Sequence, residues 1–358
     1  MRVGLLIYGS LDSISGGYLY DRKLVAYLLA QGDQVETVSL LWRNYTRHLL
    51  DNFSRDLLKK LRNLSVDVLI QDELNHPSLA WLNSRLQVSF PIISLVHHLR
   101  SEETYPKWQT FLYHQIERRY LKSVDGFIFN SQTTQQSVDH VSAMDHRPWV
   151  IATPAGDRFN PQISPDEIIQ RAHQQGPLRL IFLGNLIPRK GLHILIEALA
   201  RLPQDHHTLD VIGGLEANHA YTQQVVAQVK RLELRESVKF HGTLDDSEVA
   251  KLLERGQILV VPSSYEGFGI VYLEGMGFGL PCIGTIRGAA SEIIVPGKTG
   301  YLVNPNDSSG LADELENLYQ DRRKLATLSL AARQRYLAFP EWQQSMAQVR
   351  AFLHKIIQ

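Results

Sequence analysis

The sequence contains one cysteine and no surplus of either charge. Cys282 stands alone among 358 residues, which excludes an internal disulfide and a zinc site built from several cysteines. It lies in an apolar Leu-Pro-Cys-Ile run, so a buried structural thiol is expected. The 37 Lys and Arg residues balance 37 Asp and Glu residues. A nucleic-acid scaffold normally carries a basic surplus, and we therefore expect no nucleic-acid partner.

Long apolar runs are also missing. No stretch approaches the ~20 apolar residues that span a bilayer. Residues 3–8 are too few for the core of a secretory signal, so a cytoplasmic protein is expected.

Residues 51–64 are a candidate for peripheral contact with the inner face of an anionic membrane. As one helix, they would gather apolar residues on one side and cations around them: Phe53, Leu57, Leu61 and Leu64 against Arg55, Lys59 and Arg62. A surface helix packed on its own domain is the alternative.

The order of apolar segments predicts two α/β domains. At roughly 150 residues per domain, 358 residues correspond to about two domains. Short apolar, β-branched runs alternate with segments of helical period, which is typical of parallel sheets covered by helices on both faces. The polar, Pro-containing stretch 155–177 interrupts this alternation. We therefore predict doubly wound domains over 1–165 and 166–340, and a helix over 341–358 that is a candidate to pack back on the first.

Gly16 and Gly17 lie between the first predicted strand and the first predicted helix. Glycines at this place let backbone N–H groups approach an anion, and the helix N-terminus adds a favourable partial charge. The spacing is not that of a dinucleotide-binding loop, and the second predicted strand ends in Ser39-Leu40-Leu41, without an acidic residue for a ribose. The pair is a candidate phosphate loop, with a plain turn as the alternative, and dinucleotide binding is disfavoured.

The second predicted domain opens with a strand followed by adjacent cations. Residues 184–191 include Arg189 and Lys190 and lead into a predicted helix. Ligands of parallel sheets bind beyond the carboxyl ends of the strands, where such cations can hold a diphosphate. A solvated basic turn is the alternative.

Residues 261–274 combine two glutamates with a glycine-rich segment. Glu266 ends a loop after a predicted strand, and Glu274 lies in the following helix. The backbone amides of 267–270 and Glu266 can point at one ligand while Glu274 reaches another part of it. Carboxylates suit sugar hydroxyls because each accepts two charge-assisted hydrogen bonds. Two glutamates at this spacing also occur by chance, so the Pro-Ser and Gly-Phe-Gly surroundings carry the signal.

The sequence has no Asp-x-Asp triplet. A divalent ion that bridges a nucleotide diphosphate is usually held by such carboxylates. We therefore expect no metal and no other cofactor. A departing diphosphate would instead be stabilised by cationic side chains and backbone N–H groups.

Taken together, these features resemble a family 4 retaining glycosyltransferase with the GT-B architecture, in which two Rossmann-like domains face an interdomain cleft. The matching segments run along nearly the whole chain: Gly16-Gly17, Val96-His97-His98, Phe129-Asn130-Ser131, Ala155-Gly156-Asp157, Arg189-Lys190-Gly191, Phe240-His241-Gly242, Glu266 with Glu274, Glu292-Ile293-Ile294 and Gly297-Lys298-Thr299-Gly300.

The resemblance implies four catalytic residues. His97 would lie beside the reacting centre, and Glu266 would face the donor sugar. Arg189 and Lys190 would neutralise the departing phosphates. One position departs from the family pattern, which often has Arg directly after Gly184, where this chain has Asn185. A satisfied histidine at a strand end is the alternative for His97.

The resemblance also implies a donor-binding set. Glu274 would bind the ribose hydroxyls of the nucleotide, and Gly16 and Gly17 would approach the diphosphate from the first domain. The remaining members would contact the sugar and diphosphate from the second domain: Gly242, Gly267, Phe268, Gly269 and Ile270.

The implied activity is transfer of a hexose from a nucleoside-diphosphate sugar, UDP-sugar by default, to a glycan, lipid or small-metabolite acceptor. The anomeric configuration would be retained, and no metal would be needed. Two alternatives stay open. The first is a GT-B-like nucleotide-sugar epimerase or hydrolase, and the second is a non-catalytic protein that binds nucleotide sugars.

Overall fold

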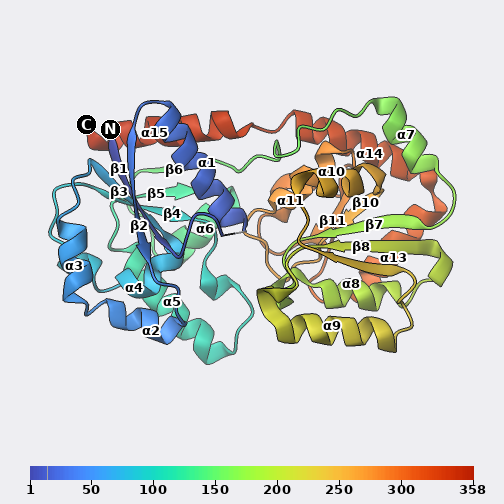
Figure 1. Cartoon of the computed structure of the whole chain (residues 1–358), viewed down its shortest axis with the longest axis horizontal. Helices are drawn as coiled ribbons and strands as arrows, with labels where there is room; N and C mark the ends of the chain where they lie inside the picture. The colour runs from blue at the N-terminus through green and yellow to red at the C-terminus, as the bar shows by residue number, and fades with distance from the viewer. Residues whose placement is uncertain (14) are drawn as a thin grey trace. The chain divides into compact units, whose positions relative to one another are not determined.

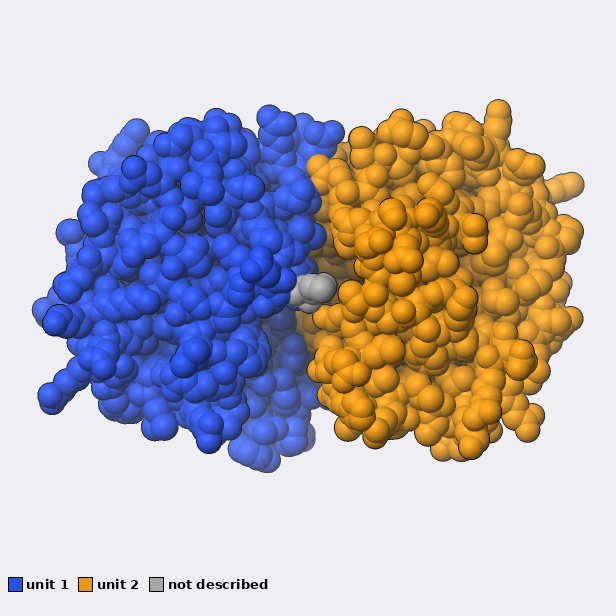
Figure 2. Space-filling view, in the orientation of Figure 1, with its two compact units in different colours: residues 1–154, 340–358 blue, residues 155–339 orange. Residues whose placement is uncertain are grey.

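The computed structural model describes residues 1–13 and 15–358, and the chain divides into two compact units. Unit 1 comprises residues 1–154 and 340–358, and unit 2 comprises residues 155–339 (Figure 2). Each unit contains a six-stranded parallel sheet with helices on both faces (Figure 1). The predicted α/β class is confirmed.

Unit 1 holds the first six strands. Its strands are β1 (Arg2–Tyr8), β2 (Gln34–Leu40), β3 (Val68–Asp72), β4 (Ile92–Val96), β5 (Gly126–Phe129) and β6 (Trp149–Ile151). Its helices are α1 (Gly16–Ala30), α2 (Tyr45–Asp51), α3 (Arg55–Arg62), α4 (His76–Leu79), α5 (Lys107–Leu121), α6 (Gln132–Val141) and the C-terminal α15 (Trp342–Ile357). The strand order is β2-β1-β3-β4-β5-β6. Strands β3, β4 and β5 are buried along their whole length, because helices cover both of their faces.

The C-terminal helix α15 packs on unit 1, alongside α1 (Figure 1). Trp342, which is 4% exposed, places its ring 5.5 Å from that of Tyr20 on α1. In the middle of α15, Arg350 Nε donates to Asp33 Oδ2 over 2.7 Å, and the Met1 ammonium lies 2.9 Å from Oδ1 of the same carboxylate. Met1 and α15 are therefore tied to one side chain.

Unit 2 holds the other six strands. Its strands are β7 (Leu178–Leu183), β8 (His207–Ile212), β9 (Val238–Gly242), β10 (Ile258–Val260), β11 (Cys282–Thr285) and β12 (Gly300–Val303). Its helices are α7 (Pro165–His173), α8 (Leu192–Leu199), α9 (His219–Arg231), α10 (Asp246–Arg255), α11 (Ile270–Gly277), α12 (Ala290–Ile293), α13 (Ser308–Gln320) and α14 (Arg322–Leu337). The strand order is β12-β11-β10-β7-β8-β9. Cys282 is fully buried in β11, as expected for a structural thiol.

The segment 155–165 packs with unit 2, although the sequence analysis assigned it to the first domain. A Cβ on Gly156 would lie 2.5 Å from Cβ of Leu273, so the backbone runs directly over α11. Further along, Arg333 Nη2 on α14 donates to the carbonyl of Pro161 over 3.0 Å. These contacts place the boundary after residue 154 rather than after residue 165, because polar loop composition alone does not reveal which core a segment covers.

The stretch 51–64 is not one helix. Ser54 caps α3 by accepting from the Leu57 amide over 3.1 Å, so that helix begins at Arg55, after a break from α2. Leu57 and Leu61 are 8% and 0% exposed within unit 1, whereas Phe53 is 72% exposed. Within the described residues, every helix is too short or too polar to cross a membrane.

Candidate active site

Both sheets reverse their strand order beside the first strand of the unit. In unit 1, β1 lies between β2 and β3, and in unit 2, β7 lies between β8 and β10. Open parallel sheets bind ligands where the order reverses, beyond the carboxyl ends of the strands. The loops at these points carry Gly16 and Gly17 after β1, and the Arg189-Lys190 and Glu266 segments after β7 and β10.

Lys190 and Glu266 form the central contact of the unit 2 site. Lys190 Nζ donates to Glu266 Oε2 over 2.7 Å, and both side chains are largely buried. Ser263 Oγ donates to the same oxygen over 3.0 Å. Burial opposes the charge on Glu266, but Lys190 and Arg189 outweigh it, and the pKa of this carboxyl lies below its ordinary value. Glu266 is therefore ionised at neutral pH.

The turn that carries these cations is locked to the loop after β10. Arg189 Nη1 donates to the carbonyl of Tyr265 over 2.8 Å, and the Ser264 amide donates to the carbonyl of Arg189 over 2.8 Å. Gly191 ends the turn at φ 71°, where a Cβ would lie 2.1 Å from the carbonyl oxygen of Pro262. Only glycine fits this position, because the two loops touch through their backbones.

Glu274 is buried on α11 and faces a cation that the sequence analysis did not single out. Its Oε1 lies 3.6 Å from Nη1 of Arg158, and the carboxylate is 3% exposed. Arg158 also pairs with Asp246 at the start of α10. Burial raises the pKa of Glu274 above its ordinary value, although Arg158 acts in the opposite direction. Arg158 thus holds a buried carboxylate that would otherwise lack a charged partner.

The glycine-rich segment between Glu266 and Glu274 forms the start of α11. Gly269 is the N-cap residue at φ 96°, and no side chain caps the helix there. Phe268 is 3% exposed and packs its ring 6.1 Å from that of Phe339. The first amides of α11, from Ile270 onwards, therefore point toward the same edge of the sheet as Glu266, with a partial positive charge.

Asn185 and Gly242 lie further along this edge. Asn185 stands where the family often has arginine. Its Oδ1 accepts from the Gly214 amide over 3.2 Å and so joins the loops after β7 and β8. Gly242 ends β9 at φ 73°, and its carbonyl accepts from the Gly213 amide over 2.9 Å. Two strands, β7 and β8, separate β9 from β10 in the sheet. Gly242 is therefore set apart from the central contact of the site by the width of two strands.

In unit 1, Gly17 and His97 lie against each other. Ser15 caps α1 by accepting from the Tyr18 amide over 3.3 Å, which places both glycines in the first turn. A Cβ on residue 17 would lie 3.2 Å from Cδ2 of His97, directly after β4. Asn130 Nδ2 donates to the carbonyl of His97 over 2.7 Å and fixes its backbone. The sequence analysis named these residues without predicting their contact.

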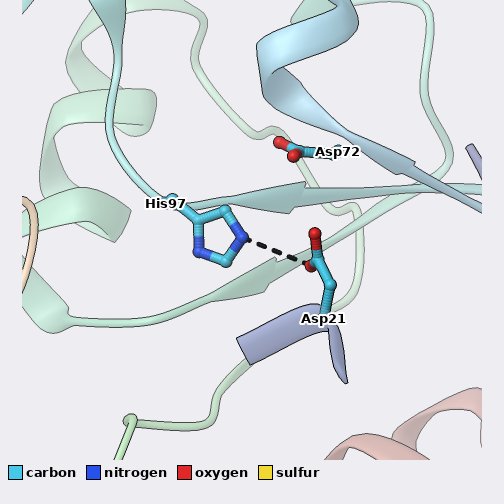
Figure 3. A group of neighbouring side chains, drawn as sticks. All are labelled: Asp21, Asp72 and His97. Carbon is cyan, nitrogen blue, oxygen red and sulfur yellow. Dashed lines mark ion pairs between the residues drawn. The ribbon is translucent and has the colours of Figure 1, made fainter. Parts of the chain in front are cut away.

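Two carboxylates that the sequence analysis did not connect with His97 lie beside it (Figure 3). Asp21 on α1 has Oδ1 3.5 Å from His97 Nε2. Asp72 ends β3 and accepts from the Leu74 amide over 2.9 Å. Burial and the nearby Asp21 raise the pKa of Asp72 to about 7. Burial would lower the pKa of His97, but Asp21, Asp72 and Glu73 outweigh it and raise the pKa above its ordinary value.

Two groups of three side chains bring potential metal-ligand atoms within 4.8 Å of one another: Asp21, Asp72 and His97, and Glu73, His76 and Glu117. In the second group, both nitrogens of His76 have partners, Tyr45 and the carbonyl of Glu73. Glu117 accepts from the amides of Arg100 and Ser101 and from the Ser101 hydroxyl. In the first group, His97 pairs with Asp21. Since His76 and Glu117 have partners within the chain and His97 lies beside Asp21, we assign neither group as a metal site.

Residues 164–335 match the sequence profile of the family described as "Glycosyl transferases group 1". This range covers nearly all of unit 2, including Lys190, Glu266 and Glu274. This part of the chain is therefore similar to that family. The chain also has curated relatives of known activity. Glycogen synthase from Mycobacterium tuberculosis is 34% identical over 177 residues, which are 48% of this chain and 41% of that protein. The chain thus spans less than half the length of this relative.

Solved structures extend the likeness of fold to both units of the chain. Sucrose-phosphate synthase from Thermosynechococcus elongatus has a TM-score of 0.83 at 20% identity, covering 99% of this chain and 98% of the other. HepE from Anabaena, solved in complex with UDP and glucose, has a TM-score of 0.78 at 20% identity, covering 99% of this chain and 100% of the other. The predicted GT-B fold is confirmed, and the predicted resemblance to a glycosyltransferase family is confirmed over residues 164–335.

Proposed function

We propose that the protein is a retaining glycosyltransferase that moves a hexose from a nucleoside-diphosphate sugar to an acceptor, without a metal. The observation that carries the proposal is the Lys190–Glu266 pair, which joins the loops at the strand reversal of unit 2 over 2.7 Å. It sets a cation and an ionised carboxylate side by side, where such sheets bind phosphate and sugar groups. The family match supports transfer rather than the epimerase, hydrolase or non-catalytic alternatives.

The cations would act on the leaving diphosphate. As the bond from the anomeric carbon to the phosphate oxygen lengthens, negative charge grows on that oxygen. Lys190 and Arg189 would stabilise this charge. An ammonium carries three N–H donors and a guanidinium five, so their contacts to Glu266 and Tyr265 are compatible with further contacts to phosphate. A phosphate oxygen would then take the acceptor proton on the same face of the sugar.

The other residues would hold the donor. Glu274 would accept from the ribose hydroxyls of the nucleotide, and Glu266 would accept from hydroxyls of the sugar. The amides of 267–270 would contact the sugar and the diphosphate. Gly16 and Gly17 would let the start of α1 approach the diphosphate, and His97 would lie beside the reacting carbon. Gly242 would belong to the same donor site.

The donor is best identified by a thermal-shift panel of UDP-glucose, GDP-mannose and ADP-glucose. UDP-sugar is our default, and it is supported by the UDP bound to HepE. A ligand at 100 times its Kd stabilises the folded state by about 2.7 kcal/mol, so the correct donor should raise the melting temperature clearly. The anomeric coupling constant of the product then tests retention. A panel without any stabilising member, or donor consumption that no acceptor increases, would overturn the proposal.

Metal independence is tested with the same assay. We expect full activity after exhaustive treatment with EDTA, because cations and backbone amides replace the metal at the diphosphate. Activity that is lost with EDTA and restored by Mg²⁺ or Mn²⁺ would contradict this.

Peripheral membrane contact through 51–64 is a separate proposal. Phe53 and the surrounding cations Arg55, Lys59, Lys60 and Arg62 are exposed, which suits an anionic surface. We expect co-sedimentation with anionic liposomes at low salt that is weakened in Phe53→Ser. Absence of co-sedimentation, or equal binding to neutral liposomes, would contradict it.

A further inference from the structure

Asp21 is a buried carboxylate whose surroundings are unusual. Its side chain is fully buried, and neither of its oxygens accepts a hydrogen bond from any residue that the structure describes. A buried carboxylate without hydrogen bonds is costly unless a cation lies nearby. The group that can supply this charge is His97, whose Nε2 lies 3.5 Å from Oδ1 of Asp21.

Packing fixes the His97 ring at this carboxylate. The ring lies against Gly17 on one side, and the ring of Tyr20 meets it edge-on with the centroids 5.3 Å apart. Figure 3 shows Nε2 directed at Asp21 and the other ring nitrogen, Nδ1, directed away from it. The His97 side chain is 15% exposed, in contrast to Asp21. One nitrogen therefore faces a buried carboxylate, and the other is left for a substrate.

The groups around the imidazole are mostly acidic. Asp21 faces it from α1, and Asp72 and Glu73 face it from the end of β3 and the residue after it. Tyr18 on α1 belongs to the same surroundings, since burial, Asp72 and Asp21 together raise the pKa of its hydroxyl. Asp72 already accepts a backbone hydrogen bond from Leu74, and Asp21 does not. Asp21 is therefore the carboxylate whose negative charge gains most from a proton on Nε2 of His97.

We propose that Asp21 is a positioning residue that holds His97 as an imidazolium, with Nε2–H directed at Asp21 and Nδ1–H presented as a charged donor to a sugar hydroxyl or phosphate oxygen. This role rests on the proposed glycosyltransferase function. Because the carboxylate favours the charged ring, activity should fall as pH rises through the pKa of His97. Without the carboxylate, burial would dominate and this loss should occur at lower pH.

The first test needs no substrate. Imidazole NMR of the full chain, with His97→Gln used to assign the resonance, gives the pKa and the protonated nitrogens of His97. We expect a pKa above the ordinary value near 6.5, and a decrease of about one unit or more in the nearly isosteric Asp21→Asn. Asp72→Asn, which removes a carboxylate that does not face Nε2 directly, should give a smaller decrease. An unchanged pKa in Asp21→Asn, or a neutral ring protonated on Nδ1, would overturn the proposal.

The second test uses turnover with UDP-glucose, or the donor found in the panel. Asp21→Asn should move the alkaline limb of kcat to lower pH, with a loss at pH 8 that is about five times the loss at pH 6 for a shift of about one unit. Asp21→Glu should restore part of the profile, which a merely structural role would not predict. A uniform loss at every pH would overturn the role. If no donor is turned over, the proposed function fails, and the NMR result still decides the pairing.

A metal ion is the competing occupant of these side chains. Stoichiometric Zn²⁺ or Mn²⁺ in the purified protein, lost together in Asp21→Asn and Asp72→Asn, would replace the proposed pairing by a metal site. We expect no bound metal that depends on these carboxylates. The melting temperatures of the variants control for folding.

Discussion

Lys190 and Glu266 are 76 positions apart in the sequence, yet their charged atoms lie 2.7 Å apart. Both were predicted as site residues because each follows a strand in a loop of distinctive composition. Their pairing could not be predicted, because it depends on β7 and β10 being neighbours, and strand order is not encoded locally. Arg158 and Asp21 were missed for the same reason. Each is an ordinary charged residue whose importance arises only from a buried partner distant in sequence.

Replacing Lys190 tests its proposed action on the leaving group. Lys190→Ala should lower kcat about 10²-fold while changing KM much less, because the charge matters most when the diphosphate departs. Lys190→Arg should retain part of the activity. Steady-state kinetics with the exposed Lys251→Ala as control would measure this. Equal changes in kcat and KM would assign Lys190 to ground-state binding instead.

Replacing Glu274 tests nucleotide binding. Glu274→Ala removes a charged hydrogen-bond acceptor, and the affinity for UDP should fall by about 1.5–3 kcal/mol. Calorimetry with UDP, GDP and ADP measures the loss, and Glu236→Ala on an exposed loop is the matched control. Unchanged affinity for all three nucleotides would refute the ribose assignment.

The helices and strands lie close to their predicted positions where short apolar runs alternate with segments of helical period. The stretch 51–64, considered as a single helix, is divided in the structure, because Ser54 acts as a capping residue and α3 starts only at Arg55. The turn at Gly191 shows the opposite case. Its composition indicated a cation-bearing loop, and the structure adds that the backbone of this loop packs closely against the carbonyl of Pro262.

Gly191→Ala should destabilise unit 2 by more than the cost of placing an alanine in the left-handed conformation. The left-handed conformation alone costs an alanine roughly 1–2 kcal/mol. Gly297 has the same φ of 71°, but a Cβ there would meet no described atom within 4 Å, so this position provides the matched control. Gly191→Ala should lower the melting temperature further than Gly297→Ala and speed hydrogen exchange in 261–269. Equal effects would show that the two loops separate without cost.

At the scale of the molecule, the class and number of domains were predicted, but their boundary was not. Segment 155–165 is polar enough to serve as a linker, and only its contacts with α11 and α14 assign it to unit 2. The place of α15 was left as a hypothesis for a related reason. The sequence of an amphipathic helix indicates which of its sides is buried, but not which surface that side packs against.

Trp342→Ala tests the contribution of α15 to unit 1. Removing a buried tryptophan typically costs about 3–5 kcal/mol. Hydrogen exchange should therefore accelerate in α1, while the strands of unit 2 keep their protection. Trp108, which is 67% exposed on α5, gives the control Trp108→Ala. Faster exchange confined to unit 2 would contradict the packing of α15.

The attachment of Met1 and α15 to Asp33 has a practical consequence for engineering. Unit 1 is built from two separated stretches of sequence, whereas the Met1 ammonium and Arg350 share one carboxylate. A circular permutant opened between Pro154 and Ala155, with a short linker from Gln358 to Met1, would make each unit a single continuous stretch. Such a chain would cross from one unit to the other once instead of twice.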